Sequence, residues 1–173
     1  MVKIIGMILV FGGATAIGFY LPGLLKKKLE FLVNFRQSVY LLRNEINYSI
    51  NTLVVSFLNI FERSNNQYVK NFFLEIYEQL ENKDSVNLRN VWEVGIDDLS
   101  NKEIINENEK KYLKSFGNSL GYLDKEMQLK NIDLLIESLD ESIKRLKENY
   151  EKHSKLYSRM GILVGLMVVV VMF

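Results

Sequence analysis

Residues 124–173 read DKEMQLKNIDLLIESLDESIKRLKENYEKHSKLYSRMGILVGLMVVVVMF, and they predict one long helix that begins polar and ends apolar. Apolar or ring-bearing residues recur there every three or four positions, with Glu, Lys and Arg between them: Ile132, Leu135, Leu139, Ile143, Leu146, Tyr150, His153 and Tyr157. This spacing is typical of a helix that packs along another helix. From Met160 to Phe173 no side chain is charged, so this end of the helix can lie in the hydrocarbon core of a lipid bilayer.

The composition excludes most kinds of active site. The 173 residues include no cysteine, and His153 is the one histidine. Disulfides, zinc-thiolate sites and cysteine nucleophiles are therefore excluded, and histidine-based catalysis has little to work with. The sequence contains neither a phosphate-binding G-x-x-x-x-G-K-[ST] loop nor basic residues interleaved with aromatic ones. We therefore expect no enzyme, no metal, no cofactor and no nucleic-acid partner.

The N-terminal segment Met1–Leu25 has the length of a membrane-spanning helix and one charged side chain, Lys3. Two interpretations remain open. The segment is a permanent transmembrane anchor, or it is a signal peptide cleaved at Ala14-Thr15-Ala16, which would leave an exported or surface-anchored helical domain. The anchor is favoured, because the apolar run continues past Ala16 to Leu25 and a basic cluster follows at once.

Basic residues mark the inner ends of both apolar segments: Lys26, Lys27, Lys28, Lys152, Lys155 and Arg159. Since positive charge collects on the cytoplasmic side, we expect a cell-membrane protein with both termini outside and the centre in the cytoplasm. The predicted parts are anchors over 1–25 and 156–173 and a cytoplasmic domain over 26–155. Met160–Phe173 spans only about 21 Å as a helix, so shallow or partner-dependent insertion also remains open.

Small residues recur at four-residue spacing in the two apolar segments: Gly12, Ala14, Ala16, Gly18, Gly161 and Gly165. In lipid such faces allow two helix backbones to approach closely, which suggests helix packing and a possible homo-oligomer. The alternative is that these residues reflect ordinary transmembrane composition.

The middle of the chain predicts an all-α helical bundle. Helices are expected from Lys26 to a break at 49–51, then over 52–63, 67–81, 86–99 and 108–120, with polar turns between them. The helix over 52–63 is apolar on more than one face, which indicates a central position. The helix over 86–99 carries the apolar residues Leu88, Val91, Trp92, Val94 and Ile96, and Trp92 is expected to fill the core rather than to bind a ligand.

An acidic stretch runs from Glu75 to Lys110, with ten acidic and four basic side chains. An anionic membrane surface would repel this stretch and attract the basic clusters, which would turn the acidic end away from the bilayer. A solvated surface without a partner explains the same charges, as does a basic partner.

One segment is more specific than its periodicity. Residues 113–128 read LKSFGNSLGYLDKEMQ, with the spacing F-G-x-x-L-G-x-x-D-x-x-x-Q given by Phe116, Gly117, Leu120, Gly121, Asp124 and Gln128. Glycine is unfavourable inside a helix, so Gly117 and Gly121 are expected to end one helix and turn the chain, and Asp124 to cap the next.

This motif, followed by a long helix with a G-x-L-x-G end, resembles the stage III sporulation protein AB family. Leu42, Glu45-Ile46, Tyr48 and Leu53 agree with the resemblance, whereas Asn51-Thr52 replaces a frequent Thr-Pro and a lysine at 27 or 28 replaces a usual arginine. The resemblance covers nearly the whole chain.

The resemblance implies a membrane complex between mother cell and forespore in endospore-forming bacteria. It implies a domain similar to the cytoplasmic helical domain of the type II secretion inner-membrane platform protein F. By this analogy the chain is a non-enzymatic docking platform, and its partners are the complex's ATPase, stage III sporulation protein AA, and other proteins of the channel.

Overall fold

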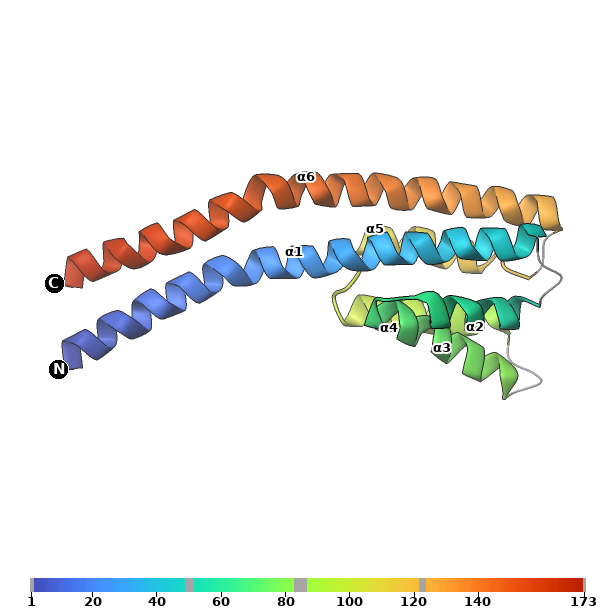
Figure 1. Ribbon diagram of the computed structural model, residues 1–173, viewed down its shortest axis with the longest axis horizontal. Coiled ribbons are helices and arrows are strands. Elements are labelled where there is room, and N and C mark those ends of the chain that lie inside the picture. Colours follow the sequence, from blue (N-terminus) through green and yellow to red (C-terminus); the bar gives the residue numbers. More distant parts are fainter. Residues whose placement is uncertain (1, 49–51, 83–86, 122–123, 173) are drawn as a thin grey trace. The chain divides into compact units, whose positions relative to one another are not determined.

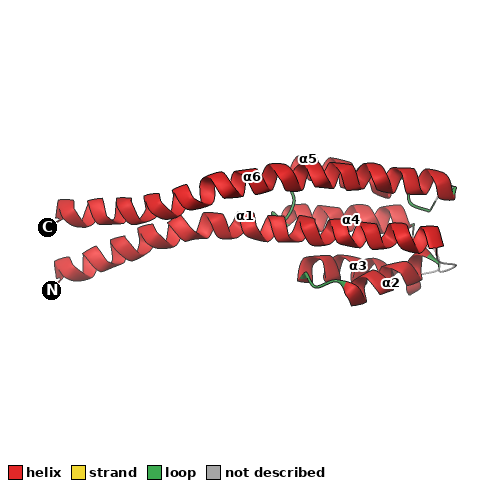
Figure 2. Ribbon diagram, turned by 45° about the horizontal axis from the view of Figure 1, so that its top comes forward, coloured by secondary structure: helices red, strands yellow, loops and turns green. Residues whose placement is uncertain are grey.

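The computed structural model describes residues 2–48, 52–82, 87–121 and 124–172, and these residues form helices and turns without a strand (Figure 2). The prediction of an all-α protein is confirmed. Before 22 and after 152, side chains are described only for Gly6, Gly13, Tyr20, Leu163 and Met167. The helices are α1 (Val2–Tyr48), α2 (Leu53–Arg63), α3 (Gln67–Glu81), α4 (Leu88–Asn101), α5 (Glu107–Gly117) and α6 (Lys125–Met172), labelled in Figure 1.

The chain divides into two compact units. One consists of Met1–Leu29 and Lys144–Phe173, in which an end of α1 packs with an end of α6. The other, Glu30–Ile143, contains the four short helices and the remaining parts of the two long ones. Within the described residues, a search for a helix both long enough and apolar enough to cross a bilayer finds none. The expected anchors and domain boundaries remain predictions.

Polar caps set where the helices begin. Asn66 accepts hydrogen bonds from the backbone N–H groups of Tyr68 and Val69 at 3.0 and 3.3 Å, and Asn106 forms a reciprocal capping box with Glu109. Each cap satisfies a backbone donor that the first helical turn leaves without a partner. Thr52 caps α2 in the same way, with its hydroxyl accepting from Val55 N at 3.4 Å.

The core of the unit Glu30–Ile143 is aromatic and draws on α1, α3, α4 and α5, with Phe57 of α2 stacked on Phe73. Trp92 is fully buried, and its ring centroid lies 5.0 Å from Phe72, 6.3 Å from Phe35 and 5.4 Å from Phe116. These edge-on arrangements are ones that aromatic pairs favour. The prediction that Trp92 fills the core is confirmed.

The predicted contact row of α6 is buried where it lies in this unit. Ile132, Leu135 and Leu139 are at most 3% exposed, and their counterparts on α1, Leu32, Phe35, Val39 and Leu42, are fully buried. Ile143, Leu146 and Tyr150 are half-buried, while the side chains of His153 and Tyr157 lie outside the described part. The remaining packing is sequential, with α2 on α3, α3 on α4 and α4 on α5.

The prediction that the helix over 52–63 is central is wrong. In α2 only Ser56, Phe57 and Ile60 are buried, so most of its apolar side chains lie at the edge of the packing. Val94 of α4, although apolar, is 62% exposed, because it lies about 200° around α4 from Ile96, which faces the core.

Some predicted boundaries also shift. The helix expected over 86–99 ends at Asn101 and begins at Leu88, after the cap Asn87; residues 83–86 lie outside the described residues. The helix expected over 108–120 is Glu107–Gly117.

Candidate partner-binding site

Gly117 is the last residue of α5, at a position where the chain passes very close to the core tryptophan. A Cβ atom added there would lie 2.2 Å from Trp92 Cδ1. The indole is fixed in place, since its Nε1–H donates a 2.8 Å hydrogen bond to the Leu113 carbonyl in α5. Only glycine fits without a rearrangement.

The rest of the motif forms the connection from α5 to α6. Leu120 is 1% exposed, and Gly121 has φ = +81°, a left-handed conformation that favours glycine. Asp124 Oδ1 accepts a 2.9 Å hydrogen bond from Met127 N in the first turn of α6, and Gln128 is half-buried one turn further. Residues 122 and 123, between Gly121 and Asp124, lie outside the described residues. The motif thus sets how α6 starts relative to α5.

A groove of about 320 Å³ lies beside this motif, between α5 and α6. Its walls combine hydroxyl, amide and apolar groups from both sides: Tyr112, Ser115, Phe116 and Ser119, and opposite them Asn131, Leu134, Leu135 and Ser138. Leu134 is 53% exposed there. None of the eight residues carries a charge at neutral pH, so the groove suits a partner surface with apolar and uncharged polar groups.

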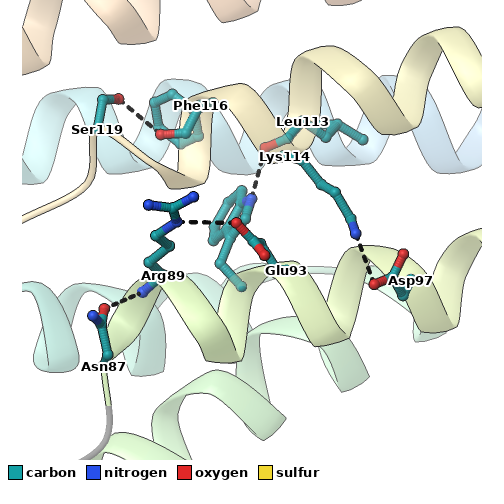
Figure 3. Close-up of polar contacts among 9 residues, drawn as sticks. Asn87, Arg89, Glu93, Asp97, Leu113, Lys114, Phe116 and Ser119 are labelled. Atoms are coloured by element: carbon teal, nitrogen blue, oxygen red, sulfur yellow. Dashed lines mark hydrogen bonds and ion pairs between the residues drawn. The ribbon is translucent and has the colours of Figure 1, made fainter.

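The polar groups of the groove are held in place by neighbours. Ser119 Oγ donates to the Phe116 carbonyl at 2.7 Å (Figure 3), and Tyr112 Oη donates to the buried Ser142 Oγ at 3.4 Å. Fixed side chains lose less conformational entropy when a partner binds.

On the α4 side of α5, charges form a bridge. Asp97 of α4 contacts Lys110 Nζ at 2.9 Å and Lys114 Nζ at 2.7 Å, the latter drawn in Figure 3. Hydrogen bonds from Lys114 and Lys110 lower the pKa of Asp97 below its ordinary value. One carboxylate thereby ties two successive turns of α5 to α4.

The residues expected at the membrane are placed only in part. Lys26, Lys27 and Lys152 are exposed, and Lys28 is half-buried. For the other predicted residues the backbone is helical, but the side chains lie outside the described part: Gly12, Ala14, Ala16, Gly18, Lys155, Arg159, Gly161 and Gly165. Their packing stays a prediction.

Across the described residues, no three His, Asp or Glu side chains are arranged to hold a metal ion. The groove itself was missed from sequence. Its signal is modest. Asn131, Leu134 and Ser138 of α6 are spaced i, i+3, i+7, which places polar and apolar groups on one face of that helix. Ser115 lies in α5 and Ser119 in the turn after it.

Comparison with known proteins decides the family. Residues 3–173 match the family described as stage III sporulation protein AB. The chain belongs to this family. Stage III sporulation protein AB of Bacillus subtilis (strain 168) is 24% identical over 172 residues, which cover 99% of each chain. No solved structure gives a significant match.

Membership of the stage III sporulation protein AB family supports a role in sporulation and confirms the resemblance seen in the motif Phe116 to Gln128. The match runs through the motif, the long helix that follows it and both apolar ends. The groove beside the motif is therefore built from a segment that the family match includes.

Proposed function

We propose that this chain is a non-enzymatic platform of the channel complex between mother cell and forespore, and that it docks the complex's ATPase, stage III sporulation protein AA. The observation that carries the proposal is the family match over residues 3–173. A rigid helical bundle with a fixed, uncharged groove suits a docking role, since it presents a preformed surface.

The proposal includes two membrane anchors, Met1–Leu25 and the apolar end of α6, with the central domain in the mother-cell cytoplasm. The basic residues at the inner ends of both segments support this topology. Because the chain has no cysteine, a thiol reagent labels only a cysteine that is introduced, and the labelling shows on which side of the membrane that residue lies.

Asn101→Cys tests the topology, since Asn101 is exposed at the end of α4. In intact protoplasts of non-sporulating cells that produce the full chain, a membrane-impermeant maleimide should leave this cysteine unlabelled and should label it after permeabilisation. A cysteine added after Phe173 is the matched control and should be labelled without permeabilisation, since its side of the membrane faces the medium in these cells. Labelling of Asn101→Cys in intact protoplasts would contradict the topology.

We place the ATPase contact at the groove between α5 and α6. The groove is the concave surface next to the motif, and Leu134 offers an exposed apolar contact at its rim. An exposed apolar side chain favours binding when a partner covers it, because its surface is removed from water.

Leu134→Asp in the full chain tests the contact. The affinity for purified stage III sporulation protein AA should fall roughly tenfold or more, because the substitution places a charge in the covered surface. Val94→Asp is the control, since Val94 is 62% exposed on α4 and does not line the groove. Equal affinities for both variants and the parent protein would contradict docking at the groove.

A further inference from the structure

The two compact units of the chain differ in net charge. The unit formed by Met1–Leu29 and Lys144–Phe173 contains ten of the chain's 22 basic residues and two of its 21 acidic residues. The unit Glu30–Ile143 contains the other twelve basic and nineteen acidic residues. The excess of cations thus lies in the unit that holds both apolar ends, and an excess of this size attracts anions from outside the chain.

The cations of the two units also differ in their partners. In the unit Glu30–Ile143, six basic side chains form ion pairs with carboxylates: Arg36, Arg43, Arg89, Lys102, Lys110 and Lys114. In the other unit Lys27 and Lys152 are exposed, and within the described residues neither forms an ion pair. Their charges are therefore available to a ligand.

On α1 an exposed aromatic side chain shares a face with Lys27. Tyr20 is largely exposed and lies seven residues before Lys27, which is two helical turns or about 10 Å along the helix. Tyrosine is enriched at the boundary between the hydrocarbon and the headgroups of a bilayer, because its ring is apolar and its hydroxyl is polar. This face of α1 therefore presents an aromatic group first and a cation two turns later.

On α6 an exposed apolar row shares a face with Lys152. Leu163 and Met167 are 64% and 71% exposed, and they lie 11 and 15 residues after Lys152, which places all three on one side of the helix. Lys152 and Met167 are about 22 Å apart along the helix axis. One leaflet of a bilayer, with its headgroups, is also about 20–22 Å thick. A phospholipid that lies along this face would reach from Met167 to Lys152.

We propose that these two faces bind anionic phospholipids. The headgroup phosphate contacts Lys27 or Lys152. The acyl chains lie along Tyr20 on α1, and along Leu163 and Met167 on α6. The inference rests on the proposed membrane anchors and adds to them a preference for one class of lipid.

The combination of a cation with an apolar row is what selects a lipid. Topology alone requires basic residues beside the apolar segments, but it does not require that they share a face with exposed apolar side chains. A soluble anion such as inorganic phosphate would bind the lysines and gain nothing from the apolar row. An anionic phospholipid uses both parts, because its headgroup is attracted by the lysine and its chains cover apolar surface.

Spin-labelled lipids test the preference with the full-length protein reconstituted in phosphatidylcholine vesicles. Electron spin resonance separates lipid that is restricted by the protein from bulk lipid. Spin-labelled phosphatidylglycerol should associate about fivefold more strongly than spin-labelled phosphatidylcholine, since one basic residue near the headgroups contributes about that factor. Sodium chloride should reduce the preference, because salt screens the attraction. If inorganic phosphate reduced it further than sodium chloride at the same ionic strength, the site would be one for free phosphate and the proposal would be overturned.

Two matched double variants locate the site. Lys27→Gln with Lys152→Gln should lose most of the preference for phosphatidylglycerol. Lys111→Gln with Lys130→Gln is the control, since it removes the same charge from exposed positions in the unit Glu30–Ile143, and it should keep the preference. Circular dichroism shows whether both variants remain helical. An equal loss in the two variants would overturn the proposal.

The same spectra separate this inference from the proposed anchors. A chain without anchors in the bilayer would restrict neither spin-labelled lipid, which would contradict the proposed topology and this inference together. A chain that restricts phosphatidylglycerol and phosphatidylcholine to the same extent would retain its anchors and would exclude the lipid preference alone.

Discussion

Arg36 in α1 and Asp140 in α6 form a two-point ion pair: Arg36 Nε lies 2.7 Å from Asp140 Oδ1, and Nη2 lies 3.0 Å from Oδ2. Arg43 and Asp133 repeat the arrangement at 2.6 and 3.3 Å. Both arginines and both aspartates are seven residues apart, which is one heptad on each antiparallel helix. Together the two pairs fix the register in which α6 returns along α1 within the unit Glu30–Ile143.

The ion pair between Arg36 and Asp140 should contribute measurably to the free energy of unfolding. In a double-mutant cycle of Arg36→Ala and Asp140→Ala, we expect an interaction energy of about 0.5–1 kcal/mol, since the pair is well oriented but partly exposed. Chemical unfolding of the full chain in detergent measures it. The i, i+4 pair Lys102–Asp98 is the comparison, with an expected coupling of about 0.3–0.5 kcal/mol. Strict additivity at Arg36 and Asp140 would show that the pair contributes nothing.

Gly117→Ala should destabilise the protein by roughly 1–3 kcal/mol, because the added methyl group collides with the indole of Trp92. Thermal unfolding followed by circular dichroism checks this. Gly23→Ala is the matched control in α1, where an added Cβ meets nothing within 4 Å. The control should be neutral or stabilising by up to about 1 kcal/mol, as alanine favours helix more than glycine does. Equal effects at the two glycines would contradict the close contact.

Gly121→Val should destabilise for a different reason. Its nearest neighbours, Leu88 Cδ2 at 3.8 Å and Leu53 Cδ1 at 4.0 Å, leave room for a side chain, but φ = +81° does not suit a β-branched residue. The expected cost is about 1–3 kcal/mol. Gly121→Asn should cost less, because asparagine tolerates the left-handed region. An unchanged unfolding midpoint for Gly121→Val would refute the turn.

Acid should weaken the bridge between α4 and α5. The pKa of the Asp97 carboxyl is lower in the folded protein than in the unfolded chain, because Lys114 and Lys110 donate hydrogen bonds to it. Its stabilising effect is therefore complete above the unfolded pKa of about 4 and is lost as pH falls through the lower folded pKa. Asp97→Asn should unfold with a smaller dependence on pH below about 4 than the parent protein. Identical pH profiles would show that the bridge does not contribute.

Much of the fold follows from local sequence, because the signals that end and start these helices are local. Asn66 and Asp124 lie where a polar residue precedes an apolar periodic segment, and both act as caps. Residues 32–46 of α1 and 132–157 of α6 are predicted by periodicity instead, because their apolar residues recur every three or four positions over several turns. The apolar ends of both helices are predicted by the length of their apolar runs.

Composition alone does not show which side chains a helix buries. Val94 is apolar, yet it points away from the face shared by Trp92 and Ile96, and a residue's type alone does not show its direction. Lys125 makes a contact that no local signal predicts, since a cation is unfavourable at the start of its own helix. It instead donates a 2.5 Å hydrogen bond to the Asn47 carbonyl in the last turn of α1, a contact between residues 78 positions apart.

The groove between α5 and α6 was not predictable for a related reason. Ser115 and Leu134 are ordinary surface residues in sequence, and only the packing of α5 against α6 makes them walls of one groove. The family motif indicated the turn beside the groove but not the groove itself.

The most direct test of the platform role places a photo-crosslinking residue at position 134, in full-length protein produced by sporulating cells. We predict an adduct with stage III sporulation protein AA, and little or none when the same residue replaces Val94. An ATPase that is present in the cells but forms no adduct from position 134, or forms it equally from position 94, would contradict docking at this surface.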